Sequence, residues 1–337
     1  MHSLSLLRVG AWMLAAFAVT ALAGPGLVAA DPDAQLDPAV ARWQPPGSSF
    51  FVIQLTDGST LLADHVQRAG DQLIVDRLGS QQTIEASRVT NLTASGVSGR
   101  ARFPLGSDRL GRDVLARLLQ GARVSLAVGL SAVLLGLILG LAVGAVAGGF
   151  GGWADGILMR SVDALLCFPQ LVLVLAIAAL IGPSLALVVL VLGGTAWMPI
   201  ARLVRAEIVA LKERDFVAAA RAVGETRLRI LLRHLLPNAL TPALIAAALL
   251  VSDLILGEAT LSFLGLGVQA PTPSWGAMIA EARDSLPVAW WGAVFPGTAL
   301  ALTVMACNLV ADGLRDRLDP RQRRSTSTVV ASPVSPP

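Results

Sequence analysis

The chain has 337 residues, of which 54% are hydrophobic and 15% are charged, with a mean hydropathy of +0.67. Soluble domains carry about 25% charged residues, so this composition excludes a water-soluble protein folded around one core. The formal net charge of +3 comes from basic loops between apolar segments, which gives a nucleic-acid partner no support.

Apolar segments of span length recur along the chain. Crossing ~30 Å of hydrocarbon takes roughly 20 helical residues. The long apolar stretch over 164–201 is interrupted by Gly182-Pro183-Ser184, and we interpret it as two spans because Gly and Pro open turns. The sequence therefore predicts an all-α polytopic membrane protein with six transmembrane helices, near residues 7–28, 123–148, 162–181, 185–202, 239–262 and 289–312.

Residues 1–30 admit two interpretations. Arg8, the apolar segment after it and Ala21-Leu22-Ala23 before Gly24 also describe a cleavable signal peptide. The apolar run continues to Ala30, which is longer than the core of most such peptides. We therefore expect a retained first transmembrane helix over 1–30, followed by an outer linker over 31–48.

Residues 49–102 have a different character from the spans. Apolar runs rich in β-branched and aromatic residues are separated by turn signals such as Asp57-Gly58, which predicts hairpins. We expect strands over 50–55, 60–66, 72–78 and 83–86, forming an inserted β-domain, a small barrel or curled sheet that is SH3-like. His65 stands alone and the carboxylates lie at turns, so a spacer or docking module without catalytic residues is favoured.

Residues 103–123 predict an amphipathic helix lying along the membrane interface, capped by Ser107 or Asp108. The helical core over 124–314 follows. In its first span a glycine recurs every four residues, which allows another helix to approach closely. Packing within the chain is the favoured role of this stripe, and a subunit interface is the alternative. The four glycines are Gly136, Gly140, Gly144 and Gly148.

Charged residues inside spans are costly and are usually functional or paired. Asp253 and Glu258 fall in the fifth span, and we expect them to line a translocation path or to pair with another subunit. Cys167 and Cys307 lie in spans without the spacing of metal ligands, so no metal site is expected.

Arginine and lysine predict the orientation. The 202–238 connection carries seven arginines and Lys212, and the tail over 315–337 carries five arginines, whereas the 263–288 connection carries only Arg283. Because basic loops stay in the cytoplasm, 202–238 and both termini are expected inside and residues 31–122 outside.

The basic loop 202–238 is the most informative segment. Arg202–Val223 can run as a helix that ends at Gly224, and Thr226 can cap a second short helix over 228–236. Small residues lie at the apex, which suits insertion into a groove on another protein. Its spacing alone is equally compatible with an interfacial helix pair stabilised by anionic lipid.

Several motifs resemble those of bacterial ABC importer permeases. The run DFVAAARAVG at 215–224, followed by RHLLPN at 233–238, resembles the EAA loop that docks on the ATPase. The dipeptide/oligopeptide/nickel branch is matched by LGSDRLGRDVLARLLQGARVSL at 105–126, EATLSFLGLGVQAPTPSWGAMI at 258–279 and NLVADGLRDRLDPR at 308–321. Two departures stand out: Ala218 replaces the glutamate of the EAA motif, and 49–102 is additional.

The resemblance implies a type I importer permease fold and a multi-pass subunit of the bacterial inner membrane. It implies a non-catalytic role, with ATP and Mg²⁺ bound by two partner ATPases, because this chain contains no GxxxxGK[ST] loop. The further implied partners are a second homologous permease, an extracytoplasmic binding protein and the lipid bilayer. The implied coupling-loop residues are Asp215, Ala219, Ala220, Gly224, His234 and Pro237.

Within the family, di- or oligopeptides are the expected substrates, and nickel complexes or other small solutes are the alternative. Two more distant alternatives are a proton-coupled secondary transporter and a membrane-anchored interaction protein built around 49–102. The first would need inverted repeats and paired ionisable groups at mid-membrane depth. The second would not need the basic loop.

Overall fold

The computed structural model describes residues 2–27, 32–36, 38–77, 79–90, 99–182 and 184–318. The chain forms two compact units. The helical unit consists of the described parts of Met1–Phe17, Leu126–Glu258 and Ala301–Pro337, and the mixed unit consists of those of Ala18–Ser125 and Ala259–Leu300. Strands and a short helix occur in the mixed unit, whereas the helical unit holds the basic loop.

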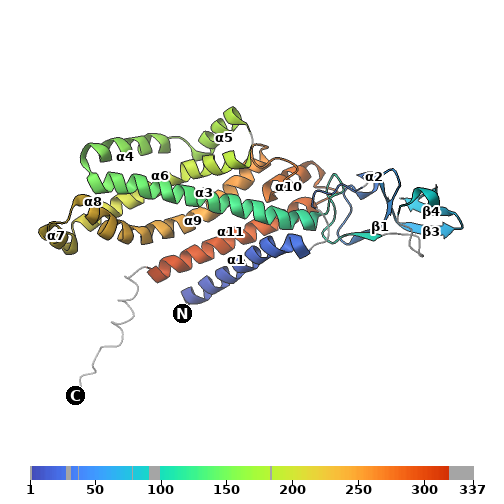
Figure 1. The fold of residues 1–337 in the computed structure, drawn as a ribbon, viewed down its shortest axis with the longest axis horizontal. Helices are drawn as coiled ribbons and strands as arrows, with labels where there is room; N and C mark the ends of the chain where they lie inside the picture. The colour runs from blue at the N-terminus through green and yellow to red at the C-terminus, as the bar shows by residue number, and fades with distance from the viewer. Residues whose placement is uncertain are drawn as a thin grey trace, which may run out of the picture. The chain divides into compact units, whose positions relative to one another are not determined.

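Helices account for most of the described residues (Figure 1). They are α1 (His2–Leu27), α2 (Pro38–Ala41), α3 (Val114–Phe150), α4 (Gly152–Leu166), α5 (Gln170–Ile181), α6 (Leu185–Lys212), α7 (Asp215–Ala222), α8 (Arg227–Ile230), α9 (Leu236–Phe263), α10 (Trp275–Ala282) and α11 (Trp291–Leu318). Single turns of 3₁₀ helix occur at η1 (Ala86–Arg88) and η3 (Arg283–Ser285), and a π-helical turn at η2 (Leu231–Leu235) joins α8 to α9.

Five stretches of helix in the described chain are long and apolar enough to cross a membrane. They are Leu7–Gly24, Val114–Phe150, Leu185–Lys212, Arg227–Phe263 and Trp291–Arg317. These five candidate spans support the predicted multi-pass membrane protein, for which the sequence predicted six.

The predicted single helix over 162–181 is wrong. The chain leaves helix α4 after Leu166 and begins α5 at Gln170. Pro169 explains the break, because proline disfavours helical backbone in the residue before it, here Phe168. The predicted break after α5 is confirmed at Gly182, whose φ is +90°, and Ser184 Oγ caps α6 by accepting from Leu187 N at 3.1 Å. Pro183 lies outside the described residues.

The inserted segment forms antiparallel strands, as predicted. They are β1 (Ser48–Gln54), β2 (Thr60–Ala63), β3 (His65–Ala69), β4 (Gln72–Arg77), β5 (Ser80–Glu85) and β6 (Gly99–Phe103). The strands pair as two three-stranded sheets, β2-β1-β6 and β3-β4-β5, in place of one continuous sheet. The single strand predicted over 60–66 is wrong, because the chain passes from one sheet to the other at Asp64.

One apolar core joins the two sheets. Buried side chains from β1, β2 and β4, together with residues just after β1 and after β5, form a single cluster: Ile53, Leu55, Ala63, Leu73, Val75, Ala86 and Val89. At the predicted hairpin, Gly58 has a φ of +83°, which favours glycine. The Ser59 hydroxyl donates to Asp57 at 2.6 Å and, as the largest cause, holds the pKa of that carboxyl below its usual range.

The separate interfacial helix predicted over 103–123 is not present. Phe103 ends β6, a turn follows, and α3 then runs without interruption from Val114 to Phe150. The residue at the helix start is Asp113, which accepts from Leu115 N at 2.9 Å, whereas Asp108 Oδ1 accepts from Leu110 N and stabilises the preceding turn. Periodicity alone could not separate an interfacial helix from the first turns of a longer one.

The glycine stripe of α3 faces α6 inside the helical unit, where the two helices run side by side (Figure 1). A Cβ built at Gly140 would lie 2.6 Å from Ile200 Cβ, and one at Gly148 would lie 3.0 Å from Ile208 Cβ. Gly136 and Gly144 meet α6 at similarly short distances. The absence of side chains therefore lets the two backbones approach, which is the contact that packing in lipid depends on.

We predict that Gly140→Ala destabilises the subunit whereas Gly194→Ala does not. Both changes gain helix propensity. Only the first puts a methyl group against a neighbouring helix, since a Cβ at Gly194 meets nothing within 4 Å. Overpacking of this kind costs about 1–3 kcal/mol. Thermal unfolding of the purified protein in detergent should show a lower midpoint for Gly140→Ala alone. Equal midpoints for both variants would contradict the close contact between α3 and α6.

Candidate functional site

The basic loop 202–238 contains a short helix set off from the span before it. Helix α6 ends at Lys212, and α7 starts three residues later, at Asp215. The prediction of one helix over Arg202–Val223 is therefore wrong, because Arg214 adopts extended backbone (φ −83°, ψ 148°). Asp215 then lies in the first turn of α7, where a negative charge is favourable to the helix dipole.

Helix α7 ends in a Schellman motif around Gly224. Gly224 N donates to Arg221 O at 3.0 Å, and Glu225 N donates to Ala220 O at 3.1 Å. The φ of Gly224 is +86°, a left-handed conformation that side chains disfavour. The predicted role of Gly224 at the helix C-terminus is thereby confirmed, and the turn reverses the chain toward α8.

The segment after Gly224 leads directly into the next span. Thr226 Oγ1 caps α8 by accepting from Arg229 N at 3.4 Å, as predicted. The expected separate helix over 228–236 is wrong, since α8, the π-turn η2 and α9 form one helical stretch from Arg227 to Phe263. Leu231 and Leu235 are buried, while Leu228 and Leu232 are exposed.

Helix α7 presents small and apolar side chains to its surroundings. Val217 is completely buried and anchors the helix to the unit. Ala218 and Ala219 are exposed, Ala220 is half-buried, and Val223 is 85% exposed. The exposed alanines offer little polarity and little bulk, which suits a close protein contact at that part of the helix.

His234 holds the turn after α7 against η2. Its Nε2 lies 3.0 Å from Glu225 Oε2, and its ring centroid lies 6.5 Å from that of Phe216. Pro237 is exposed in the first turn of α9. Sequence reasoning missed Glu225 and Phe216, because both precede the helical stretch that carries His234, and periodicity relates only residues of one helix.

The two acidic residues of the fifth span do not form a common site. Glu258 is fully buried and Asp253 is exposed, so they occupy different faces of α9. Elsewhere on α9, Ser252 Oγ donates to Asn308 Oδ1 of α11 at 2.6 Å.

A second cluster, in the mixed unit, brings two segments together that are far apart in the sequence. Arg112 donates to Asp108 Oδ2 at 2.6 Å and to Glu281 Oε2 at 2.8 Å, and Arg117 lies 3.5 Å from each of the same two acids. Arg112 and Arg117 are 3% and 1% exposed. Burial also raises the pKa of the neighbouring Asp113 to about 6.

Trp275, at the start of α10, packs on the same part of α3. It is 1% exposed, and its indole Nε1 donates to Leu118 O at 3.0 Å. A Cβ at Gly121 would lie 3.2 Å from the Trp275 ring, so glycine is what leaves room for it. The run at 105–126 and the PSWG stretch thus form one packed structure, held by ion pairs and an aromatic anchor.

A family model described as "Binding-protein-dependent transport system inner membrane component" matches residues 132–324, more than half of the chain. The chain belongs to this family. The match includes the basic loop and begins after the β-strands, so the inserted β-domain lies outside it.

Two relatives of this inner-membrane component are also transport permeases. The chain is 45% identical over 227 residues to "Di/tripeptide transport system permease protein DppC" of Pseudomonas aeruginosa (strain UCBPP-PA14). The aligned region covers 67% of this chain and 75% of that protein. It is 44% identical over 216 residues to "Glutathione transport system permease protein GsiD" of Escherichia coli O6:K15:H31 (strain 536 / UPEC), covering 64% of this chain and 71% of that protein.

We predict that Glu281→Gln destabilises this inner-membrane component by about 3 kcal/mol, because it removes the carboxylate that pairs with both buried guanidiniums. The matched control is Asp284→Asn, three residues away, where an exposed carboxylate pairs with exposed Arg283. Thermal unfolding in detergent should show a large loss for the first change and no measurable loss for the second. Wild-type stability in Glu281→Gln would show that the cluster does not hold α10 to α3.

Proposed function

We propose that this chain is the transmembrane permease subunit of an ATP-driven importer of small peptides. The names of the two relatives support this substrate class, since one transports di- and tripeptides and the other transports glutathione, itself a tripeptide. The observation that carries the proposed mechanism is helix α7, a short helix with an exposed face of small residues between two membrane spans.

The proposed work of the chain is conformational. It contains no phosphate-binding loop of the GxxxxGK[ST] type, so two partner ATPases would bind ATP and Mg²⁺. Helix α7 would dock on an ATPase through Ala219 and Ala220. Closure of the ATPases would then displace α7, and α6 and α9 would transmit the movement to the spans. Substrate shifts this equilibrium only through unequal affinity for the two states.

The remaining partners follow from the same assembly. A second homologous permease would complete the translocation path, and a binding protein outside the membrane would deliver the peptide. Asp253 supports a neighbour on its side of α9, because an exposed carboxylate inside a span is costly against lipid. We assign Asp253 to the path or to the contact with the second permease.

The proposed topology has six crossings. The five long helices are joined by α5, whose 12 residues would cross together with flanking backbone shielded by the partner permease. The basic loop and both termini would then be cytoplasmic and residues 31–122 extracytoplasmic, which places the β-domain where a binding protein arrives.

We predict that Gly224→Val uncouples the transporter whereas Gly224→Asn does not. No atom would meet a side chain at Gly224 within 4 Å, so the effect rests on backbone conformation alone. A β-branched residue in left-handed backbone costs on the order of 1–2 kcal/mol, whereas asparagine tolerates it. Peptide-stimulated ATP hydrolysis and di- or tripeptide uptake should fall in Gly224→Val, measured in proteoliposomes and normalised to assembled complex.

Unchanged stimulation in Gly224→Val would exclude the α7 turn as the coupling element. Failure of the wild-type complex to take up any di- or tripeptide, while it imports another solute, would exclude the substrate class and leave the family assignment in place.

A further inference from the structure

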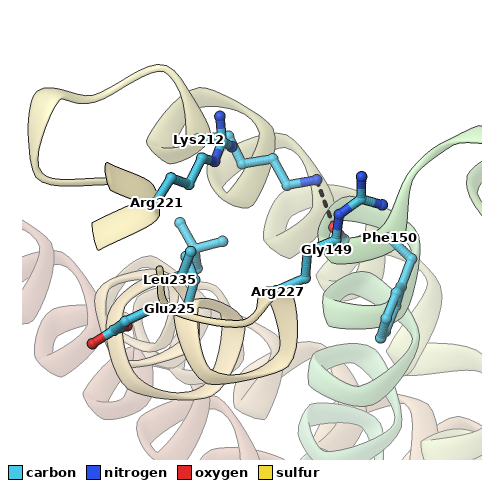
Figure 2. A pocket seen from close by; sticks show the side chains of 8 residues that line it. Gly149, Phe150, Lys212, Arg221, Glu225, Arg227 and Leu235 are labelled. Atoms are coloured by element: carbon cyan, nitrogen blue, oxygen red, sulfur yellow. Dashed lines mark hydrogen bonds between the residues drawn. The ribbon is translucent and has the colours of Figure 1, made fainter. Parts of the chain in front are cut away.

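A basic pocket lies within the helical unit, next to the turn at Gly224 that joins α7 to α8. Its volume is about 440 Å³, and it is lined by the end of α3, the end of α6 and both sides of the turn (Figure 2). Three of its lining side chains are cations: Lys212, Arg221 and Arg227. The proposed coupling role of α7 does not use these residues.

The pocket carries an excess of positive charge. Lys212 Nζ donates one hydrogen bond, to Gly149 O at 2.6 Å, and lies within electrostatic range of both Arg221 and Arg227. Among the described residues, no carboxylate forms an ion pair with either guanidinium. Three cations converging on one cavity repel one another, and this repulsion favours an anionic ligand.

The nearby carboxylates are engaged elsewhere. Glu225 lines the pocket but pairs with His234 at 3.0 Å, and Figure 2 shows its carboxylate turned away from the cations. Asp155, the acid within electrostatic range of Lys212, accepts from Arg205 Nε at 3.0 Å and from Arg205 Nη2 at 2.7 Å. Internal neutralisation of the three cations is therefore incomplete.

The position of the pocket indicates the source of the anion. Gly149 and Lys212 are at or next to the ends of two spans, α3 and α6, which is where lipid headgroups lie. Phe150 lines the pocket and is 50% exposed, and Trp153 just beyond it is 84% exposed, as expected for an aromatic residue at the membrane interface. Basic pockets between helices on the cytoplasmic side favour anionic headgroups.

The chemistry of the lining favours phosphate. Two guanidinium groups can each make a pair of charge-assisted hydrogen bonds to phosphate oxygens, and Lys212 keeps two further N–H donors. The cavity is larger than one phosphate ion needs, which leaves space for the glycerol groups of a lipid headgroup.

We propose that this pocket binds the phosphate headgroup of an anionic phospholipid through Lys212, Arg221 and Arg227. The bound lipid bridges the last turn of α7, the first turn of α8 and the end of α6, and so fixes the angle at which α7 leaves the membrane surface. Binding itself does not depend on the proposed transport function.

The test is lipid retention by the full-length chain in detergent micelles, followed by native mass spectrometry. Phosphatidylglycerol and phosphatidylcholine are offered in competition, with inorganic phosphate as a separate arm. We expect preferential retention of phosphatidylglycerol, lowered at least about tenfold in the double variant Arg221→Gln/Arg227→Gln. The double variant Arg221→Lys/Arg227→Lys, which keeps both charges, should retain an intermediate amount because it lacks the guanidinium fork.

The matched control is Arg229→Gln/Arg233→Gln. It removes the same charge from the same segment, but these two residues line a different groove. It should retain phosphatidylglycerol as the wild type does. Equal losses in both glutamine variants would reduce the effect to general surface charge and overturn the proposal.

Three other results would also overturn it. One is equal retention of the two lipids. Another is displacement of phosphatidylglycerol by millimolar inorganic phosphate, which would make the pocket a free-phosphate site. The last is complete loss of lipid when the chain is assembled with its ATPases, which would assign the cations to carboxylates of that partner. Because retention is measured on the subunit itself, failed peptide transport would leave this result unaffected.

Discussion

The approach of α3 and α6 through the glycine stripe is the contact on which the helical unit depends. A transmembrane helix satisfies its own backbone hydrogen bonds, so neighbouring helices gain stability mainly from close side-chain and backbone packing. Four glycines on one face of α3 bring that helix against α6 along three turns. The same contact places Gly149, next to the end of α3, beside Lys212, the last residue of α6.

After that fixed end the chain enters the strongly polar segment between α6 and α9. The Schellman motif at Gly224 turns α7 back toward the spans, Thr226 restarts the helix, and the Glu225–His234 pair fastens the turn to η2. Val217 is buried and its neighbours on α7 are exposed. A helix anchored through Val217 and exposing alanines fits the docking role proposed for it.

The sequence was sufficient to predict helix ends and turns where a single residue type determines the backbone conformation. Gly224 and Thr226 end and restart helices as the sequence predicted, and Asp57-Gly58 forms a turn, because positive φ and capping depend on neighbours a few residues away. The predictions over 103–123 and 162–181 were wrong for a related reason. Hydrophobic periodicity does not show where one helix ends and the next begins. Over 162–181, Pro169 predicts the helix break, whereas the apolar run around it does not.

Contacts between distant residues could not be predicted from one sequence. Arg112 and Glu281 are 169 positions apart, and nothing in the sequence around either residue identifies the other as its partner. The basic pocket likewise combines α3, α6 and the turn after α7, whose charges look like ordinary topology signals when they are counted along the chain. In both cases the relevant quantity is the balance of charge in a small volume, and this balance exists only in the folded protein.

The central claim is that α7 is the surface on which an ATPase docks. The most direct measurement is site-directed cross-linking: a cysteine at Ala219, on the exposed face of α7, is treated with a short bifunctional maleimide in the assembled complex, with Val217→Cys as the buried comparison. The account predicts a cross-link from Ala219→Cys to an ATPase subunit, altered in yield by ATP, and none from Val217→Cys. Cross-links from Ala219→Cys to membrane-embedded or extracytoplasmic proteins only, with no ATPase product in any nucleotide state, would contradict the docking of an ATPase on α7.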